Sequence, residues 1–317
     1  MKKQYEVVKK EQPTFYFVGV TTGKSSINKL FPLWMEIFGR PELKLEGIDC
    51  KIHDEPEVYR QVVAQVKYDP NSIGGLITTH KMDLFAAARE MFDGFNDLAE
   101  ITEEISCMSK MEGRLEGHAF DPITAGQSLN AIIDPGYFGR TGGEVLLLGA
   151  GGSSLATVLH LMRQKDTADR PKRITVINRS QLRIDHMRDM VEEIGTDIEM
   201  VYLVNDDPVK NDEIMGSLPA YSIVINATGM GKDIPGSPIT DAGLFPVNGI
   251  AWEFNYRGER TFMHQALAQA EERQVRMEDG WVYFIYGWAT VVCQVLHHPM
   301  SDELIEKLSA AGEKIRG

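Results

Sequence analysis

The sequence predicts an α/β protein of two domains: an N-terminal α/β domain and a Rossmann-type nucleotide-binding domain, with C-terminal helices returning to the first. Three observations predict this fold. The chain has 317 residues, more than one ordinary core needs. Apolar runs alternate with helix-length amphipathic segments, and at 145–154 the run VLLLGAGGSS places glycines where a strand should meet a helix. Strands separated by helices favour crossover connections and mostly parallel sheets.

The first domain should alternate strands and helices before ending in a hairpin. The hydrophobic periodicity predicts strands at Thr14–Gly19, Gly47–His53 and Gly74–Thr78, and helices at Ile27–Phe38, Glu57–Lys67 and Lys81–Phe92. The segment MEGRLEGHAF then indicates a hairpin, Ser106–Met111 with Arg114–Ala119, which ends just before Asp121. A linking helix is expected at Ile123–Ile133.

The second domain repeats the alternation. It should contain strands at Glu144–Leu148, Arg173–Ile177, Ile198–Val204, Ser222–Asn226 and Gly249–Phe254, and helices at Ser154–Arg163 and Phe262–Glu272. Two last helices follow, the uncharged Gly280–Leu296 and the amphipathic Ser301–Lys314, whose Ser301 suits an N-cap. We therefore expect a substrate domain at 1–122, completed by 280–317, and a nucleotide-binding domain at 123–279.

Composition and net charge disfavour several classes of binding partner. The net charge of -13 disfavours nucleic acid and anionic membranes. The three cysteines, Cys50, Cys107 and Cys293, form no CxxC pair, which favours a reducing compartment and excludes a recognisable thiolate zinc site. The polar N-terminus lacks the apolar stretch of a secretory signal. We predict a cytoplasmic protein without a metal.

The uncharged segment Gly280–Leu296 raises the question of a membrane span. It is slightly shorter than the roughly 20 apolar residues that a span needs. It also contains glycines, tyrosines and a glutamine, and it lacks flanking basic residues. These features favour a buried helix and no membrane anchor.

The glycine-rich turn is the strongest local motif. Glycines let a backbone turn tightly and approach a pyrophosphate, whose charge the following helix N-terminus stabilises. The spacing is GxGG rather than the full GxGxxG, so a purely conformational loop is the alternative. The cofactor contacts expected in this turn are Gly149, Ala150, Gly151, Gly152 and Ser153.

Two further loops point to NADP. The strand after the turn ends in Asn178-Arg179-Ser180, with Arg183 one helical turn later, instead of the acidic residue that would accept a ribose 2′-hydroxyl. Arginines there suit a 2′-phosphate, although an ordinary solvated face is the alternative. The loop Asn226-Ala227-Thr228-Gly229 follows another strand and should face the cofactor.

Ordered landmarks from about residue 14 to 298 together resemble the shikimate dehydrogenase family, of which the chain looks like a divergent member. The segments that carry the resemblance are GVTTGKSSINKLF (19–31), GGLITTHK (74–81), GHAFDPITAG (117–126), the cofactor loops NRSQLR and NATGMG, and EFNYRGERTFMHQA (253–266) with EDGWVYFIYG (278–287). The resemblance implies a dehydrogenase that passes a hydride between NADP and a ring carbinol or ketone.

Carried over by position, the family's catalytic pair falls on Lys81 and Asp121. The resemblance implies that Lys81 is the acid/base and Asp121 its partner, because a lysine beside a carboxylate in a closed cleft can hold and relay a proton. Taken alone, each residue favours a structural interpretation, Lys81 as a surface lysine at a helix start and Asp121 as a helix cap. His80 and His118 lie nearby in sequence, and structural roles are expected for both.

The substrate positions depart from the family pattern. Where two serines usually flank a lysine, this chain has Gly23 and Ser25 around Lys24. The family's threonine aligns with Ile77, its asparagine with Met108 and its late glutamine with Gly287. Neighbouring residues offer replacements, so the predicted substrate-binding residues are Gly23, Ser25, Thr78, Ser109, Tyr256, which matches a family tyrosine, and Tyr283.

The departures at the substrate-binding positions leave three candidate functions open. Each substrate hydroxyl left unpaired on burial costs about 1–3 kcal/mol, which disfavours shikimate itself. We expect a dehydrogenase acting on a less hydroxylated or larger cyclic hydroxy or oxo acid. A non-catalytic NADP(H)-binding regulator and a true shikimate or quinate dehydrogenase are the alternatives, and a homodimer is an open question of assembly.

Overall fold

The computed structural model describes residues 5–232 and 234–316. The chain divides into two compact units: unit 1 runs to Phe120 and resumes at Ile285, and unit 2 is Asp121–Phe284. The functional boundaries that the sequence suggests, at 122/123 and 279/280, remain predictions. Each unit contains its own sheet, and each is described separately below.

Unit 1 is built on a sheet of order β2-β1-β3-β5-β6-β4 in the described chain. The strands are β1 (Thr14–Gly19), β2 (Lys44–Asp49), β3 (Ser72–Ile77), β4 (Gly94–Phe95), β5 (Cys107–Met111) and β6 (Arg114–His118). Neighbours pair in parallel except at β5, which is antiparallel to both β3 and β6. Strand β6 therefore runs in the same direction as β1 and β3, and the carboxyl ends of all three lie at one edge.

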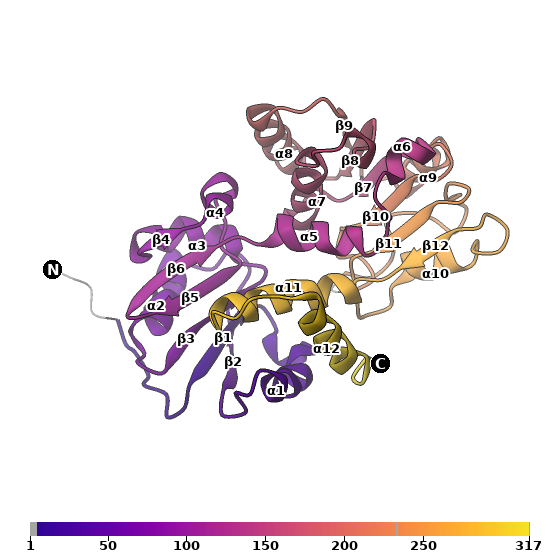
Figure 1. Cartoon of the computed structure of the whole chain (residues 1–317). Helices are drawn as coiled ribbons and strands as arrows, with labels where there is room; N and C mark the ends of the chain where they lie inside the picture. Colours follow the sequence, from indigo (N-terminus) through magenta and orange to yellow (C-terminus); the bar gives the residue numbers. More distant parts are fainter. Residues whose placement is uncertain (1–4, 233, 317) are drawn as a thin grey trace. The chain divides into compact units, whose positions relative to one another are not determined.

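Helices cover both faces of this sheet. They are α1 (Ile27–Ile37), α2 (Pro56–Tyr68), α3 (Lys81–Ala88), α4 (Asp97–Thr102), the greater part of α11 (Trp281–Val295), and α12 (Asp302–Glu313). Alternation along β1 explains the packing. Tyr16 and Val18 join the core beneath α2 and α3, whereas Phe15 and Phe17 turn to the other face, where both rings lie near Trp288 of α11. Figure 1 shows the greater part of α11 alongside this sheet.

Unit 2 is a doubly wound parallel sheet of order β12-β11-β10-β7-β8-β9 within the described residues. Its strands are β7 (Val145–Leu148), β8 (Arg173–Asn178), β9 (Glu199–Val204), β10 (Ile223–Asn226), β11 (Ile250–Glu253) and β12 (Arg276–Glu278). Counted from β7, this is the strand order 3-2-1-4-5-6 of dinucleotide-binding folds. The α/β fold predicted from the sequence is confirmed.

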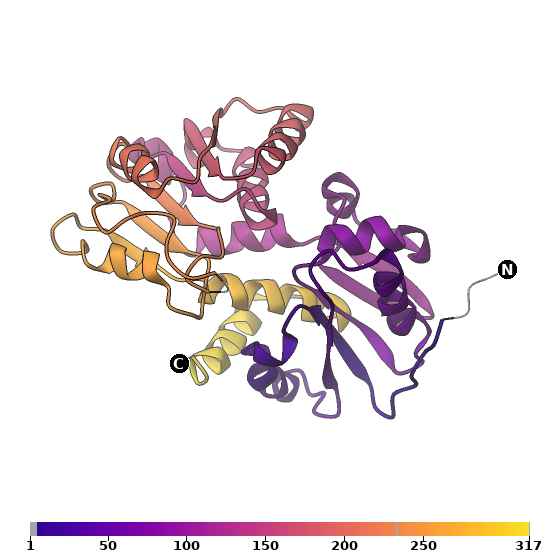
Figure 2. The same cartoon turned by 180° about the vertical axis from the view of Figure 1, so that it is seen from behind.

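Two apolar cores bury the faces of this second sheet. Its helices are α5 (Asp121–Asn130), α6 (Tyr137–Thr141), α7 (Gly152–Met162), α8 (Gln181–Ile194), α9 (Pro208–Gly216) and α10 (Thr261–Leu267). One core joins Leu147 and Val176 to α5, α7 and α8, and the other joins Leu146 and Leu148 to α9 and α10. Figure 2 shows α10 in orange in front of the strands.

The structure adds elements that the periodicity did not predict. Helix α8 was not expected, although Ile184, Met187 and Val191 recur at helical spacing and are buried. Helix α3 ends at Ala88, four residues earlier than expected, and a 3₁₀ turn covers 89–91. Helix α11 coincides with the uncharged segment, and no helix in the described part of the chain is long and apolar enough to span a bilayer.

Candidate functional site

The turn after β7 is formed by backbone contacts that require glycine. Gly149 has φ +111°, and a Cβ there would come within 2.7 Å of the Ala227 carbonyl oxygen. The Gly149 N–H donates to the Ile177 carbonyl at 2.7 Å, and the Gly149 carbonyl accepts from the Ser154 hydroxyl at 2.8 Å. Gly151 is the N-cap of α7 and Gly152 its first residue. The turn therefore presents the helix N-terminus with no side chain across it, as a pyrophosphate requires.

The basic residues after β8 belong to the same edge of unit 2. Arg179 and Arg183 are both exposed, and neither forms an ion pair with another residue in the described ranges. The Arg183 Nη1 atom lies 3.5 Å from where a Cβ on Gly151 would stand, so its guanidinium reaches the glycine turn. Asn178 ends β8 and donates to the Ser180 carbonyl at 3.3 Å, which shapes the corner.

The loop after β10 is organised by one amide side chain. Asn226 is fully buried, and its Oδ1 accepts from the Thr228 backbone N–H at 3.2 Å and the Thr228 hydroxyl at 2.7 Å. The Thr228 hydroxyl oxygen in turn accepts from the Met230 N–H at 3.1 Å. Gly229 and Gly231 have φ of +77° and +87°. Ala227 N–H donates to the Leu148 carbonyl at 2.8 Å, which ties this loop to the end of β7.

Glu253 contacts this loop; it is the first residue of the segment 253–266 that carries the family resemblance, but the sequence predicted no role for it. It ends β11, pairs in register with Asn226, and is fully buried. Its Oε2 accepts from Asn226 Nδ2 at 2.8 Å, and its Oε1 accepts from the Asn255 N–H at 2.9 Å. Burial raises the pKa of Glu253 to about 7, against the opposing effect of those hydrogen bonds and of the Arg260 charge. A charged residue closing the apolar run IAW was the available signal.

In unit 1 the carboxyl ends of β1 and β3 place the predicted substrate loop and Lys81 at one edge. In open α/β sheets, ligands bind outside the carboxyl ends of the strands. Residues 20–25 follow β1, residues 78–81 follow β3, and residues 119–120 follow β6 and lead into Asp121. The topology thus gathers the substrate loop and the lysine motif within this unit.

The loop after β1 is fixed by the end of β2. Thr22 donates to Asp49 Oδ1 through both its backbone N–H, at 2.8 Å, and its hydroxyl, at 2.6 Å. Ser25 Oγ faces the first turn of α1, where it accepts from the Ile27 N–H at 3.4 Å. Gly23 is exposed, and a Cβ there would meet no atom of unit 1 within 4 Å. Gly23 and Ser25 remain predictions as substrate contacts, on a loop whose backbone is held in place.

The two predicted catalytic residues occupy the starts of helices. Lys81, in unit 1, is the first residue of α3, is half-buried, and accepts the Ile105 N–H at its carbonyl at 3.2 Å. Asp121, in unit 2, is the first residue of α5 and is 9% exposed. Thr78 lies just before Lys81, with its N–H donating to the Val18 carbonyl at 3.0 Å. The roles of these residues stay predictions.

His80, adjacent to Lys81, is tied into the interior of unit 1. It is fully buried, and its Nδ1 lies 3.1 Å from the Tyr59 hydroxyl. That hydroxyl also lies 3.4 Å from Asp83 Oδ2. These contacts anchor the start of α3 from beneath, in keeping with the structural role expected of this histidine.

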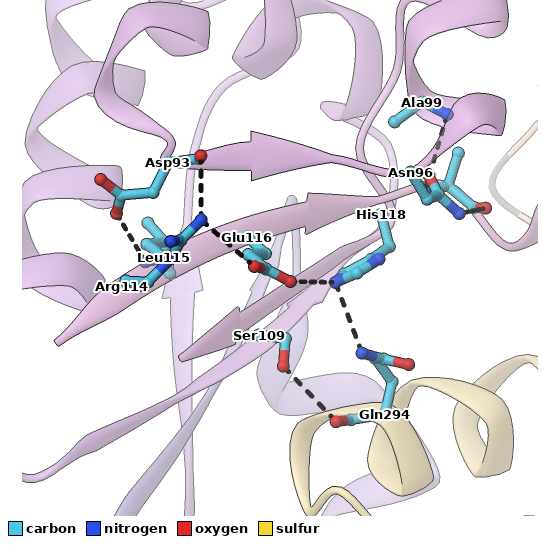
Figure 3. A network of polar contacts seen from close by, with 10 residues as sticks. Asp93, Asn96, Ala99, Ser109, Arg114, Leu115, Glu116, His118 and Gln294 are labelled. Atoms are coloured by element: carbon cyan, nitrogen blue, oxygen red, sulfur yellow. Dashed lines mark hydrogen bonds and ion pairs between the residues drawn. The ribbon is translucent and has the colours of Figure 1, made fainter. Parts of the chain in front are cut away.

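Ser109, His118 and Gln294 form a polar cluster between the sheet of unit 1 and α11 (Figure 3). The Ser109 hydroxyl donates to the Gln294 carbonyl at 3.4 Å, and the Gln294 amide nitrogen lies 3.4 Å from His118 Nε2. The His118 ring is stacked on Phe120, and burial lowers its pKa against the opposing charge of Glu116. Ser109 therefore has a partner within the fold, while its role toward substrate stays a prediction.

Met108 and Gly287, two of the positions where the sequence departs from the family pattern, have different surroundings in unit 1. Met108 is fully buried in the core beneath α2 and α3, so it fills that core. Gly287 lies on α11, and a Cβ there would meet no atom of unit 1 within 4 Å. Removal of the family's glutamine therefore leaves open space on this helix rather than a filled position.

The predicted aromatic contacts lie in unit 2. The Tyr256 ring is 4.4 Å from that of Phe284 and 6.0 Å from that of Trp281. The Tyr283 ring is 5.0 Å from that of Phe254. Both tyrosines thus belong to an aromatic group at the start of α11, and both remain predictions as substrate contacts.

The fold and these loops define a class: a two-unit α/β protein whose second unit has a dinucleotide-binding topology with a glycine turn after its first strand. No family model matches the chain. Similarities in sequence and in structure to known proteins specify this class further.

A shikimate dehydrogenase (NADP(+)) from Caldivirga maquilingensis is 26% identical over 170 residues, which cover 53% of this chain and 54% of that protein. The chain thus matches about half the length of that relative. Among solved structures, a Thermus thermophilus shikimate 5-dehydrogenase in complex with NADP(H) and shikimate has a TM-score of 0.68 and 20% identity, covering 95% of this chain and 99% of the other. A ligand-free 5-ketofructose reductase of Gluconobacter has a TM-score of 0.69 and 17% identity, with 96% and 99% covered. These similarities confirm the resemblance to shikimate dehydrogenases and the two-domain α/β fold that it implied.

Proposed function

We propose that this protein is an NADP-dependent oxidoreductase that transfers a hydride to or from a cyclic hydroxy or oxo acid, in a shikimate dehydrogenase-like site with altered substrate contacts. The observation that carries the proposal is the edge of unit 2, where Gly149 turns the chain beneath the N-terminus of α7 and Arg183 reaches Gly151. A backbone cradle with arginines beside it suits a pyrophosphate and a 2′-phosphate. The shikimate dehydrogenases and their NADP complexes among the similar proteins support it.

A bound cofactor would supply the redox chemistry of the proposed reaction, as NADPH donating the hydride in reduction or NADP⁺ accepting it in oxidation. Lys81 donates a proton to the carbonyl oxygen during reduction, or accepts it from the hydroxyl during oxidation, and Asp121 stabilises the ammonium form. Lys24 and Ser25 hold the substrate carboxylate, with Gly23, Thr78 and Ser109 around it. Tyr256 and Tyr283 contribute aromatic surface. Neither a metal nor a nucleic acid is needed for this chemistry.

The proposal also includes a substrate other than shikimate. Met108 is buried in the core, Ser109 already has a partner, and Gly287 leaves space. These three positions would offer fewer hydrogen bonds to a polyhydroxylated ring and more room to a bulkier one. A 5-ketofructose reductase has a similar fold, so this fold is also found in a protein named for a substrate other than shikimate.

A non-catalytic NADP(H)-binding regulator is the second candidate, because changed substrate positions are also what such a protein would show. A cytoplasmic location and a homodimer remain predictions that accompany either function. The two candidates differ in whether any substrate is turned over.

A panel assay separates the functions. NADPH absorbance is followed with shikimate, quinate, their dehydro forms and other cyclic acids, for the wild type, Lys81→Ala and the control Lys29→Ala on the exposed face of α1. We expect the wild type to turn over a compound other than shikimate. Lys81→Ala should abolish this turnover, and Lys29→Ala should retain it. Tight NADPH binding with no turnover of any compound supports the regulator, and turnover of shikimate or quinate at rates above all others supports a true shikimate or quinate dehydrogenase.

A further inference from the structure

Glu253 is a fully buried acidic residue whose carboxylate contacts Asn226 of the loop 226–231, and the proposed reaction assigns it no role. It lies at the carboxyl end of β11, beside the end of β10. In a sheet of this order, the strands on the β10 side of β7 form the second mononucleotide-binding half, which receives the nicotinamide nucleotide. Glu253 therefore stands behind the cofactor loop rather than in front of it.

The contacts of Glu253 reach the whole loop. Asn226 Nδ2 donates to the carboxylate at 2.8 Å and also lies 3.3 Å from the Met230 carbonyl. Asn255, whose N–H donates to the other carboxylate oxygen at 2.9 Å, uses its side-chain Nδ2 to donate to the same Met230 carbonyl at 2.9 Å. The orientation that Glu253 gives to the Asn226 amide in turn points Oδ1 at Thr228.

We infer that Glu253 is a positioning residue for the cofactor, whose carboxylate holds the loop 226–231 in the conformation that receives the nicotinamide half of NADPH. The inference rests on the proposed NADP site and adds a residue and a pH dependence to it. Glu253 acts through Asn226 and Asn255 and touches neither substrate nor cofactor.

The hydrogen-bond geometry makes the arrangement sensitive to protonation. Both carboxylate oxygens accept from N–H groups, so a proton on either oxygen would face a donor and break one of these bonds. Burial raises the pKa of Glu253 to about 7, so this proton exchanges near neutral pH. Asn226 from β10 and Asn255 are uncharged. Arg260, whose Nη1 lies 3.4 Å from Asp279, is the charged group that opposes the shift.

Neighbouring β12 supplies a matched control. Glu278 lies on that strand, where its Oε1 accepts from Arg276 Nε at 2.7 Å, on the far side of β11 from the loop. Glu278→Gln therefore removes a carboxylate of the same sheet without touching Asn226 or Asn255. Glu253→Gln, by contrast, replaces one acceptor with a donor and imitates the protonated state.

The first measurement is the NADPH dissociation constant from pH 5.5 to 8.5 for the wild type, Glu253→Gln and Glu278→Gln, with circular dichroism as the check of folding. The loss of one hydrogen bond predicts that wild-type affinity falls about 3- to 10-fold on acidification through pH 7. Glu253→Gln should bind at pH 8 as weakly as the wild type does at pH 6, and Glu278→Gln should follow the wild type. Equal profiles for all three proteins overturn the inference and leave the proposed function standing. Folded wild type that binds no NADPH at any pH overturns the proposed function itself.

A second measurement needs no variant. Because affinity and protonation are linked, NADPH binding at pH 7 should release protons, measurable by calorimetry in buffers of different ionisation enthalpy. The 2′-phosphate itself titrates near pH 6, so 2′-phospho-ADP-ribose, which carries that phosphate and the pyrophosphate but no nicotinamide, serves as the reference. Proton release by NADPH beyond that reference, centred near pH 7, supports Glu253. Equal release by the two ligands overturns the inference even if Glu253→Gln fails to fold.

Discussion

The carboxyl edges of the two sheets offer different parts of the chain to a ligand. In unit 2 the edge is mostly backbone: Gly149 packs against the Ala227 carbonyl, and Gly151 leaves the N-terminus of α7 uncovered. In unit 1 the edge is formed by side chains, and some of them already have partners, such as Thr22 on Asp49.

This difference explains why the cofactor loops resemble a known pattern more closely than the substrate loops do. A backbone cradle requires particular glycines. A Cβ at Gly149 would clash with the Ala227 carbonyl oxygen whichever substrate is bound. A side-chain pocket can exchange residues one at a time without disturbing the sheet, as the sequence predicts for Met108 and Gly287. The comparison predicts that mutations in unit 2 act on NADPH binding and those in unit 1 on turnover.

The largest expected effect is on catalysis, from unit 1. Lys81→Ala should lower kcat by about 10²- to 10⁴-fold, the range associated with removal of a general acid or base. NADPH affinity should stay within a factor of two of the wild type, as measured by fluorescence titration. A comparable loss in Lys29→Ala would break the assignment, since Lys29 lies on the exposed face of α1.

The glycine turn provides a matched pair in unit 2. Gly149→Ala should lower the free energy of unfolding by about 2–4 kcal/mol, because alanine at φ +111° is strained and its Cβ meets a carbonyl oxygen. Gly151→Ala, at φ -93° with only Arg183 Nη1 nearby, should remain folded but bind NADPH more weakly. Urea denaturation and NADPH titration measure the two effects. Equal stability of both variants would contradict the structural role of Gly149.

The buried carboxylate of unit 2 predicts a pH dependence of stability. The pKa of Glu253 is raised from 4.5 to about 7 by folding, so the folded state holds this proton more tightly and the stability that it contributes is lost as pH rises through that window. The free energy of unfolding of the wild type, relative to Glu253→Gln, should fall by at most about 3 kcal/mol between pH 4.5 and 7 and then level off. A constant difference across this range would contradict the shift.

The arginines test cofactor selectivity. Arg183→Ala should weaken NADPH binding by about 10- to 100-fold, the worth of hydrogen bonds to a charged group, and leave NADH binding nearly unchanged. Arg179→Ala should act in the same direction. Arg188→Ala, further along α8 and paired with Asp185 at 2.8 Å, is the control. If NADH and NADPH lose affinity equally, the 2′-phosphate assignment is wrong.

The smallest expected effect concerns a side chain with a partner inside unit 1. Ser109→Ala removes a hydroxyl that donates to the Gln294 carbonyl at 3.4 Å, so the expected cost is about 1 kcal/mol of stability or less. kcat/KM should change less than threefold. A larger fall in kcat/KM with unchanged stability would instead support the predicted contact between Ser109 and substrate.

The sequence by itself determined the fold class and the cofactor turn, because both depend on local patterns. Alternation of apolar strands with helices indicated the parallel sheets, and strand β1 was predicted at its observed bounds, Thr14–Gly19. Gly149 was recognisable because a glycine between a strand and a helix reports a backbone requirement. Helix α8 was not predicted, because the basic residues Arg179 and Arg183 at its start indicated a phosphate contact and drew no attention to the apolar periodicity that begins at Ile184.

Only the tertiary structure decided which side chains are already engaged. Pairing between β10 and β11 puts Glu253 beside Asn226, 27 positions apart in the chain, and burial there gives a carboxylate a pKa of about 7. Packing of α11 on the first sheet brings Gln294 to Ser109 and His118. Hydrogen bonds and burial between distant segments depend on register and packing, which a local pattern does not contain.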